Sequence, residues 1–171
     1  MRWVLMVAGV VVLLVLAVVV IGLLLPQTHV ASVARSYPAT PDQVWAALTN
    51  VENFAAWRPD LNAAERVPSA DGKLRWKEKT RYDSMTIEVV EAVAPKKLVT
   101  RIADEGLPFG GSWTYEIMPE TTLTRLTITE RGEVYNPIFR FVARFIMGHT
   151  ATMEKYHAGL ARRLGGKSPP D

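Results

Sequence analysis

The sequence predicts an α+β domain, in which a long C-terminal α-helix covers an antiparallel β-sheet, preceded by one membrane-spanning helix. Three observations support this prediction. The first 25 residues form an uncharged apolar run apart from Arg2, the middle of the chain alternates apolar and polar residues, and the last segment repeats apolar residues every three or four positions. Periods of two and of 3.6 residues are the signatures of half-buried strands and amphipathic helices.

Residues 1–25 are predicted to be a transmembrane anchor. Trp3 to Leu25 contain no charge and no proline, and a helix needs about 20 apolar residues to cross the hydrocarbon core. A buried core helix is one alternative, but a helix that is apolar all round has no face for water. A cleaved signal peptide, with an apolar region of about 7–15 residues, is the other. Cutting at Ser32-Val33-Ala34 would remove part of the first predicted strand, so the anchor is expected to stay uncleaved.

The charges around the anchor predict its orientation. Arg2 and the amino terminus precede the helix, and the first basic residue after it is Arg35. The positive-inside rule therefore places the N-terminus in the cytoplasm and the domain outside it, in a single-pass protein of the cell membrane.

Composition excludes several classes of function. Beyond the anchor, 19 Lys and Arg residues stand against 17 Asp and Glu residues, whereas a dedicated nucleic-acid binder carries a basic excess. The chain has no cysteine, which excludes disulfides, thiol nucleophiles and thiolate metal sites. No nucleic-acid partner is therefore expected.

The domain is predicted over residues 29–165, after a short linker at 26–28 and before a disordered tail at 166–171. Residues 29–37 form its first strand. Thr40 and Gln43 make a capping box with Pro41 in the first turn, which predicts a helix start. A second short helix or turn follows at 51–57.

The middle of the chain predicts a run of strands. In residues 74–82, Leu74, Trp76, Glu78, Thr80 and Tyr82 share one face, and basic residues occupy the other. Further strands are predicted at 85–93, 98–103, 112–118 and 123–130. Because these strands follow one another through short connections, the sheet is expected to be antiparallel. Its apolar face needs a cover, and the final helix is the only element long enough to supply one.

That final helix is predicted to exceed 20 residues. Asn136 caps it and Pro137 occupies its first position. The apolar stripe includes Phe145, His149 and Tyr156 at helical spacing.

Several strings resemble a known superfamily. They are Tyr37-Pro38-Ala39-Thr40-Pro41-Asp42-Gln43-Val44-Trp45, Leu48-Thr49-Asn50-Val51-Glu52-Asn53-Phe54, Trp57-Arg58-Pro59 and Gly110-Gly111-Ser112-Trp113-Thr114-Tyr115. In this order they resemble the START-like (SRPBCC) superfamily, in its polyketide cyclase/dehydrase and lipid-transport group. The resemblance implies a helix-grip fold, in which a curved sheet wraps the C-terminal helix around a largely apolar cavity. The anchor is an addition to that family's core.

A helix-grip cavity is where a ligand would bind. The candidate ligand-binding residues are Trp76, Glu78, Trp113, Tyr115, Ile117, Leu126, Ile128, Phe145, His149 and Met153. The alternative is that these side chains simply fill a core. Leu107 and Phe109, in the loop 104–111, are predicted to form a gate over the cavity mouth. An apolar loop tip that touches lipid, or a hairpin that packs its own residues, are the alternatives.

Glu78 is the most suggestive polar candidate, because a buried carboxylate costs free energy unless it is paired. It would orient a ligand's polar group or act as an acid or base, with Arg101 and Arg125 as possible partners. A position in water at the open end of its strand is the alternative. His149 and His157 are eight residues apart, whereas a metal pair on a helix needs a spacing of about four. No metal, cofactor or catalytic residue is therefore assigned.

The leading hypothesis is a noncatalytic membrane-anchored module that binds a hydrophobic or lipid-like small molecule. An enzyme of the cyclase or dehydratase kind is the first alternative and would use Glu78, His149 or Tyr115 as acid or base. A scaffold with a filled core, which acts through protein partners, is the second.

Overall fold

The computed structural model describes residues 2–69 and 72–165, and the tail predicted at 166–171 lies outside the described residues. The helices are α1 Arg2–Leu24, α2 Pro41–Thr49, the 3₁₀-helix η1 Val51–Asn53, α3 Phe54–Trp57, α4 Pro137–Val142, the π-helix η2 Ala143–Met147 and α5 Ala151–Arg163. The strands are β1 Thr28–Tyr37, β2 Ala63–Arg66, β3 Arg75–Lys79, β4 Ser84–Val93, β5 Lys97–Ile102, β6 Phe109–Pro119 and β7 Thr124–Val134.

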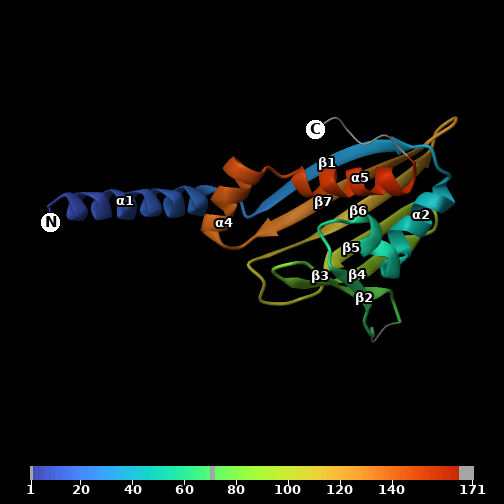
Figure 1. Cartoon of the computed structure of the whole chain (residues 1–171), viewed down its shortest axis with the longest axis horizontal. Coiled ribbons are helices and arrows are strands. Elements are labelled where there is room, and N and C mark those ends of the chain that lie inside the picture. The colour runs from blue at the N-terminus through green and yellow to red at the C-terminus, as the bar shows by residue number, and fades with distance from the viewer. Residues whose placement is uncertain (1, 70–71, 166–171) are drawn as a thin grey trace.

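Within the described residues, the strands form one antiparallel sheet in the order β1-β7-β6-β5-β4-β3-β2. The sheet curves, and α2, α3 and α5 lie against its concave side (Figure 1). The predicted helix-grip α+β fold is confirmed. The edge strand β2 was not predicted, because Ala-Ala-Glu-Arg shows no alternation and is a strand only through its pairing with β3.

The first helix of the domain starts where its capping residues predict. Thr40 Oγ1 accepts a hydrogen bond from Gln43 N at 3.3 Å, and Gln43 Oε1 accepts one from Thr40 N at 2.8 Å. These bonds satisfy two of the backbone N–H groups that have no partner within the helix at its start. The helix α2 then buries Val44, Ala47 and Leu48 against the sheet.

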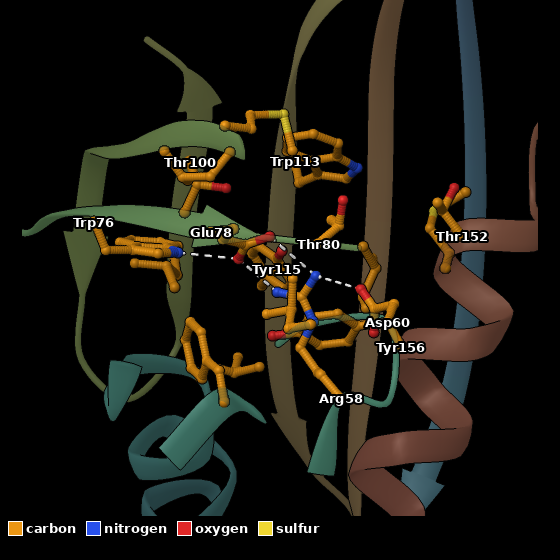
Figure 2. A pocket seen from close by; sticks show the side chains of 18 residues that line it. Arg58, Asp60, Trp76, Glu78, Thr80, Thr100, Trp113, Tyr115, Thr152 and Tyr156 are labelled. Atoms are coloured by element: carbon orange, nitrogen blue, oxygen red, sulfur yellow. Dashed lines mark hydrogen bonds and ion pairs between the residues drawn. The ribbon is translucent and has the colours of Figure 1, made fainter. Parts of the chain in front are cut away.

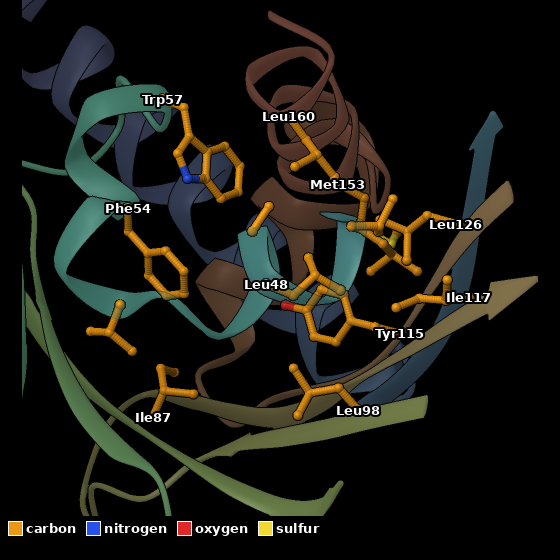
Figure 3. Close-up of a cluster of buried hydrophobic side chains, with 14 of the residues drawn as sticks. Leu48, Phe54, Trp57, Ile87, Leu98, Tyr115, Ile117, Leu126, Met153 and Leu160 are labelled. Atoms are coloured by element: carbon orange, nitrogen blue, oxygen red, sulfur yellow. The ribbon is translucent and has the colours of Figure 1, made fainter. Parts of the chain in front are cut away.

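The core lies between the concave face of the sheet and the helices (Figure 3). Phe54 of α3 makes edge-on contacts with Trp57 and Trp76, at centroid distances of 5.9 and 5.7 Å. The helix α5 approaches α3 so closely that a Cβ on Gly159 would overlap the Trp57 carbonyl oxygen. Only glycine therefore allows α5 to pack at this depth.

The prediction of one C-terminal helix of more than 20 residues was wrong. Asn136 caps the start as expected, and its Oδ1 accepts hydrogen bonds from Ile138 N and Phe139 N at 2.9 and 3.2 Å. The helix ends after η2, where Gly148 adopts φ +73°, ψ 162°. This conformation is open to glycine and strained for other residues, so the chain turns before α5 begins at Ala151.

The strand predicted at 74–82 is also shorter than expected. It ends at Lys79, and the hydroxyl of Thr80 accepts hydrogen bonds from Tyr82 N and Asp83 N in a tight turn. Tyr82 is 89% exposed, so its predicted place on the inward face was wrong.

The helix α1 is long and apolar enough to cross a membrane, a test that a signal sequence also passes. It projects away from the domain (Figure 1). Its C-terminal part meets the domain, where a Cβ on Gly22 would overlap the Pro137 carbonyl oxygen. Arg140 Nη1 donates a hydrogen bond to the Leu25 carbonyl at 3.0 Å. The start of α4 is therefore attached to the end of α1.

Candidate ligand-binding site

A cavity of about 320 Å³ opens between the concave face of the sheet and the helices α3 and α5 (Figure 2). Its volume is at the lower end of the range of about 300–1,000 Å³ found for small-molecule sites. The lining residues are Leu48, Phe54, Arg58, Asp60, Leu61, Trp76, Glu78, Thr80, Met85, Ile87, Leu98, Thr100, Trp113, Tyr115, Ile128, Thr152, Met153 and Tyr156.

Strand alternation and register bring the cavity walls together. Trp113 and Tyr115 are two residues apart on β6 and therefore face the same side. In the β5–β6 pair, Trp113 is opposite Thr100 and Tyr115 is opposite Leu98. Tyr115 is also opposite Ile128 in the β6–β7 pair. Side chains that are opposite one another in an antiparallel pair share a face, so three strands contribute to one wall.

The polar centre of the cavity is the pair Arg58–Glu78. Arg58 Nη1 and Nη2 donate to the two Glu78 carboxylate oxygens at 2.5 and 3.0 Å. Trp76 Nε1 donates to Glu78 Oε1 at 3.0 Å, and Arg58 Nη2 also donates to Asp60 Oδ2 at 2.9 Å. Figure 2 shows these groups converging on one side of the cavity. The result is a hydrogen-bonded, bidentate ion pair within apolar walls.

Charge balance keeps the Arg58 guanidinium ionised although it is buried. Burial opposes the charge on Arg58, but the adjacent Glu78, Tyr156 and Asp60 together outweigh that effect, and the pKa of Arg58 lies above its ordinary value. The guanidinium carbon also lies 5.2 Å from the centroid of the Tyr156 ring. Arg58 Nε is buried and has no hydrogen-bond partner among the described residues.

Two tyrosines face this ion pair. The rings of Tyr115 and Tyr156 have centroids 5.7 Å apart. Burial raises the pKa of Tyr115 to about 12 and raises the pKa of Tyr156 well above its ordinary value. Both phenols are therefore neutral near pH 7, so they can donate hydrogen bonds but cannot act as bases.

The structure brings six of the predicted ligand-binding residues together at the cavity: Trp76, Glu78, Trp113, Tyr115, Ile128 and Met153. Ile117 and Leu126 are 3% and 0% exposed and belong to the packed core rather than to the cavity wall.

Phe145 and His149 lie away from the cavity. Phe145 is 59% exposed, and His149 stacks on His29 with centroids 3.9 Å apart. Phe145 is on η2, before the break at Gly148, and His149 lies in the non-helical turn between this break and the start of α5. Their expected place on the cavity wall was therefore wrong, since it assumed one continuous helix.

Leu107 and Phe109, predicted to form a gate, also lie elsewhere. They line a separate surface depression of about 570 Å³. Phe109 is already the first residue of β6. Neither side chain is among those that line the cavity.

Arg58 is the residue that sequence reasoning missed. The expected partners of Glu78 were wrong: Arg101 pairs with Glu88 at 2.5 Å, and Arg125 lies 3.9 Å from Glu120. Arg58 and Glu78 are 20 residues apart on different elements, so no local spacing relates them. Among the described residues, no cluster of His, Asp or Glu side chains is arranged to hold a metal ion.

The curved sheet, the enclosing helix and the apolar cavity define a helix-grip protein with a small-molecule-sized cavity. The chain belongs to the family described as polyketide cyclase/dehydrase and lipid transport, whose profile matches residues 28–164. No curated protein sequence matches it.

Solved structures share the fold at low sequence identity. A START superfamily protein from Mycobacterium smegmatis aligns with a TM-score of 0.64 and 15% identity, over 80% of this chain and 97% of that one. A protein from Thermus thermophilus aligns with a TM-score of 0.66 and 18% identity, over 80% and 97%. Norcoclaurine synthase from Thalictrum flavum aligns with a TM-score of 0.63 and 10% identity, over 82% and 88%.

Proposed function

We propose that this protein binds a hydrophobic or lipid-like small molecule in its helix-grip cavity, next to a membrane in which α1 is anchored. The observation that carries the proposal is an apolar cavity of about 320 Å³ with a buried polar centre. Such a combination of apolar walls and a few convergent polar groups is typical of ligand sites.

The polar centre would recognise one end of the ligand. Arg58 Nε, which has no hydrogen-bond partner among the described residues, and the hydrogen-bonded pair of Tyr115 and Tyr156 hydroxyls are polar groups at the cavity. They suit a ligand oxygen, while Trp113, Ile128 and Met153 supply apolar contacts for the rest of the molecule. The charge of Arg58 is already balanced by Glu78, which favours a neutral polar group over an anionic one.

The residues considered as catalytic bases do not favour an enzyme. Both oxygens of Glu78 accept hydrogen bonds from Arg58. His149 lies outside the cavity, and the raised pKa of Tyr115 leaves it protonated. A scaffold with a filled core is not favoured either, because the cavity lies between the sheet and the helices that cover it.

The anchor would keep the cavity near a lipid reservoir. Only Leu25, Pro26 and Gln27 separate α1 from β1, so the domain would stay near the surface of the bilayer. In the orientation proposed from the flanking charges, the N-terminus is cytoplasmic and the domain is on the other side of the membrane.

Native mass spectrometry of the full chain in a mild detergent tests the binding proposal. We expect a reproducible extra mass that is lost on denaturation. Ile128→Phe adds volume inside the cavity and should reduce the bound fraction roughly tenfold, since overpacking displaces a close-fitting ligand. Met118→Phe, on the same sheet but 62% exposed, is the matched control.

Thermal unfolding of both variants checks that they fold. Equal bound fractions in the two variants would place the molecule outside the cavity. A chain that carries no extra mass, and takes up neither long-chain fatty acids nor sterols when these are added, would favour the scaffold alternative.

A further inference from the structure

The helical segment before α5 presents apolar side chains to the outside of the domain. Ile138 and Phe139 of α4 are 42% and 49% exposed, and Phe145 and Ile146 of η2 are 59% and 71% exposed. Exposed large apolar groups that are gathered on one short segment mark an interaction surface rather than ordinary surface variation.

The four side chains form two exposed pairs of neighbours, Ile138 with Phe139 in α4 and Phe145 with Ile146 in η2. The two pairs are seven positions apart in the chain. Arg140, which follows the first pair, is by contrast only 8% exposed. Arg140 Nη2 donates a hydrogen bond to the Tyr135 carbonyl at 3.1 Å, and Arg140 Nη1 donates one to the Leu25 carbonyl. The segment therefore exposes apolar side chains, and Arg140 attaches it to the domain.

This segment lies at the end of α1. The close contact of Gly22 with Pro137 places the start of α4 against the last turn of the apolar helix. Figure 1 shows α4 running across the direction of α1 rather than along it. If α1 crosses a bilayer, a helix attached across its end lies near the membrane surface, where amphipathic helices insert their apolar face.

We propose that Ile138, Phe139, Phe145 and Ile146 form a lipid-docking surface that inserts into the bilayer interface around the exit of α1. The proposal rests on the membrane anchoring in the proposed function. The exposed Tyr135, next to this surface, is a residue type enriched at such interfaces.

Docking would hold the ligand cavity at a defined position above the lipid. The segment leads through Gly148 directly into the first turn of α5, where Thr152 and Met153 line the cavity. A lipid-inserted η2 would therefore keep the N-terminal end of α5 beside the head groups. A single flexible tether would not impose that orientation.

Site-specific fluorescence tests this proposal in the full chain. The protein has no cysteine, so single substitutions Phe139→Cys and Ile146→Cys accept one polarity-sensitive label each. The labelled proteins are reconstituted into phosphatidylcholine vesicles that contain brominated lipids. Val12→Cys in α1 reports anchoring, and Met118→Cys, 62% exposed on β6, is the control outside the surface.

We expect blue-shifted emission at positions 139 and 146, with roughly twofold or greater quenching by bromines near the interface, and none at position 118. Quenching at 12 but not at 139 and 146 would overturn the docking surface and leave the anchor intact. No quenching at 12 would overturn both. A blue shift without quenching would mean that protein, such as a second copy of the chain, covers the surface, and would also overturn the proposal.

Discussion

At the scale of single residues, the cavity centres on the buried ion pair of Arg58 and Glu78. Taking two charges out of water costs several kcal/mol each, and their attraction compensates only when the geometry and the remaining hydrogen bonds are good. Trp76 and Asp60 supply such bonds here. The pair is therefore more important for the polarity of the cavity than for net stability.

This balance predicts a non-additive double-mutant cycle. Arg58→Met leaves the Glu78 carboxylate buried without its cation and should lower the free energy of unfolding by about 3–5 kcal/mol. Adding Glu78→Met should recover much of that loss, because both charges are then gone. Denaturant unfolding of the full chain in detergent measures all the variants.

Arg101→Met is the control for this cycle. It removes a similar pair with Glu88 on the surface, where the Arg101 side chain is 60% exposed, and should cost no more than about 1 kcal/mol. Strictly additive losses at Arg58 and Glu78 would contradict a coupled pair.

His157 predicts a pH dependence of stability. Its Nε2–H donates to the Val33 carbonyl at 3.1 Å, so its Nδ1 accepts from the Tyr37 hydroxyl at 2.5 Å. Burial lowers the pKa of His157 to about 4, below an unfolded value of about 6.5. The unfolded chain therefore binds more protons between these values. Stability is complete above about pH 6.5 and falls, by on the order of 3 kcal/mol, as the pH drops to about 4.

Unfolding free energies measured from pH 7.5 to 4.5 test this prediction. His157→Gln removes the titrating group while keeping polar atoms, and its stability should fall less steeply with acid than that of the wild type. Equal slopes would show that other groups account for the acid sensitivity.

At the scale of elements, the break before α5 decides which residues reach the cavity. The apolar spacing continues across Gly148 because α4–η2 and α5 each have an apolar face, although the two faces have different surroundings. The face of α5 packs into the domain through Met153 and Leu160, whereas Phe145 and Ile146 of η2 remain exposed. Periodicity shows that a segment has an apolar face, but not what that face contacts.

The packing of α5 on α3 yields an element-scale prediction. Replacing glycine by alanine in a helix usually stabilises it by about 1 kcal/mol. Gly159→Ala should instead destabilise the domain by about 1–3 kcal/mol, because the new methyl would overlap the Trp57 carbonyl oxygen. Chemical denaturation measures the change, with the exposed Lys155→Ala on the same helix as control. A stabilising effect would mean that α5 packs less deeply.

At the scale of the whole molecule, the segment that follows α1 is built into the sheet of the domain. The strand β1 pairs with β7 along its full length, from Thr28 to Tyr37. The amide of Val134 also donates a hydrogen bond to the Gln27 carbonyl at 2.8 Å. Cleavage after Ala34 would remove most of this strand. The pairing of β1 therefore argues against cleavage at Ser32-Val33-Ala34.

The sequence by itself determined the features that depend on neighbouring residues. Local patterns include the capping box at Thr40 and the cap at Asn136. They also include the two-residue spacings of Trp76 and Glu78 and of Trp113 and Tyr115, which place each pair on one face of a strand. Backbone geometry relates residues only a few positions apart in such patterns. These patterns were sufficient to predict the α+β fold, most of its strands and six residues of the cavity.

Only the tertiary structure decided which distant groups meet. The pairing of Glu78 with Arg58, the exclusion of His149 from the cavity and the contact of Gly22 with Pro137 depend on sheet curvature, strand register and the turn at Gly148. Each of these contacts or separations depends on the path of the chain between the residues. That path is set by packing over the whole domain. Local hydrophobic periodicity carries no information on those distances.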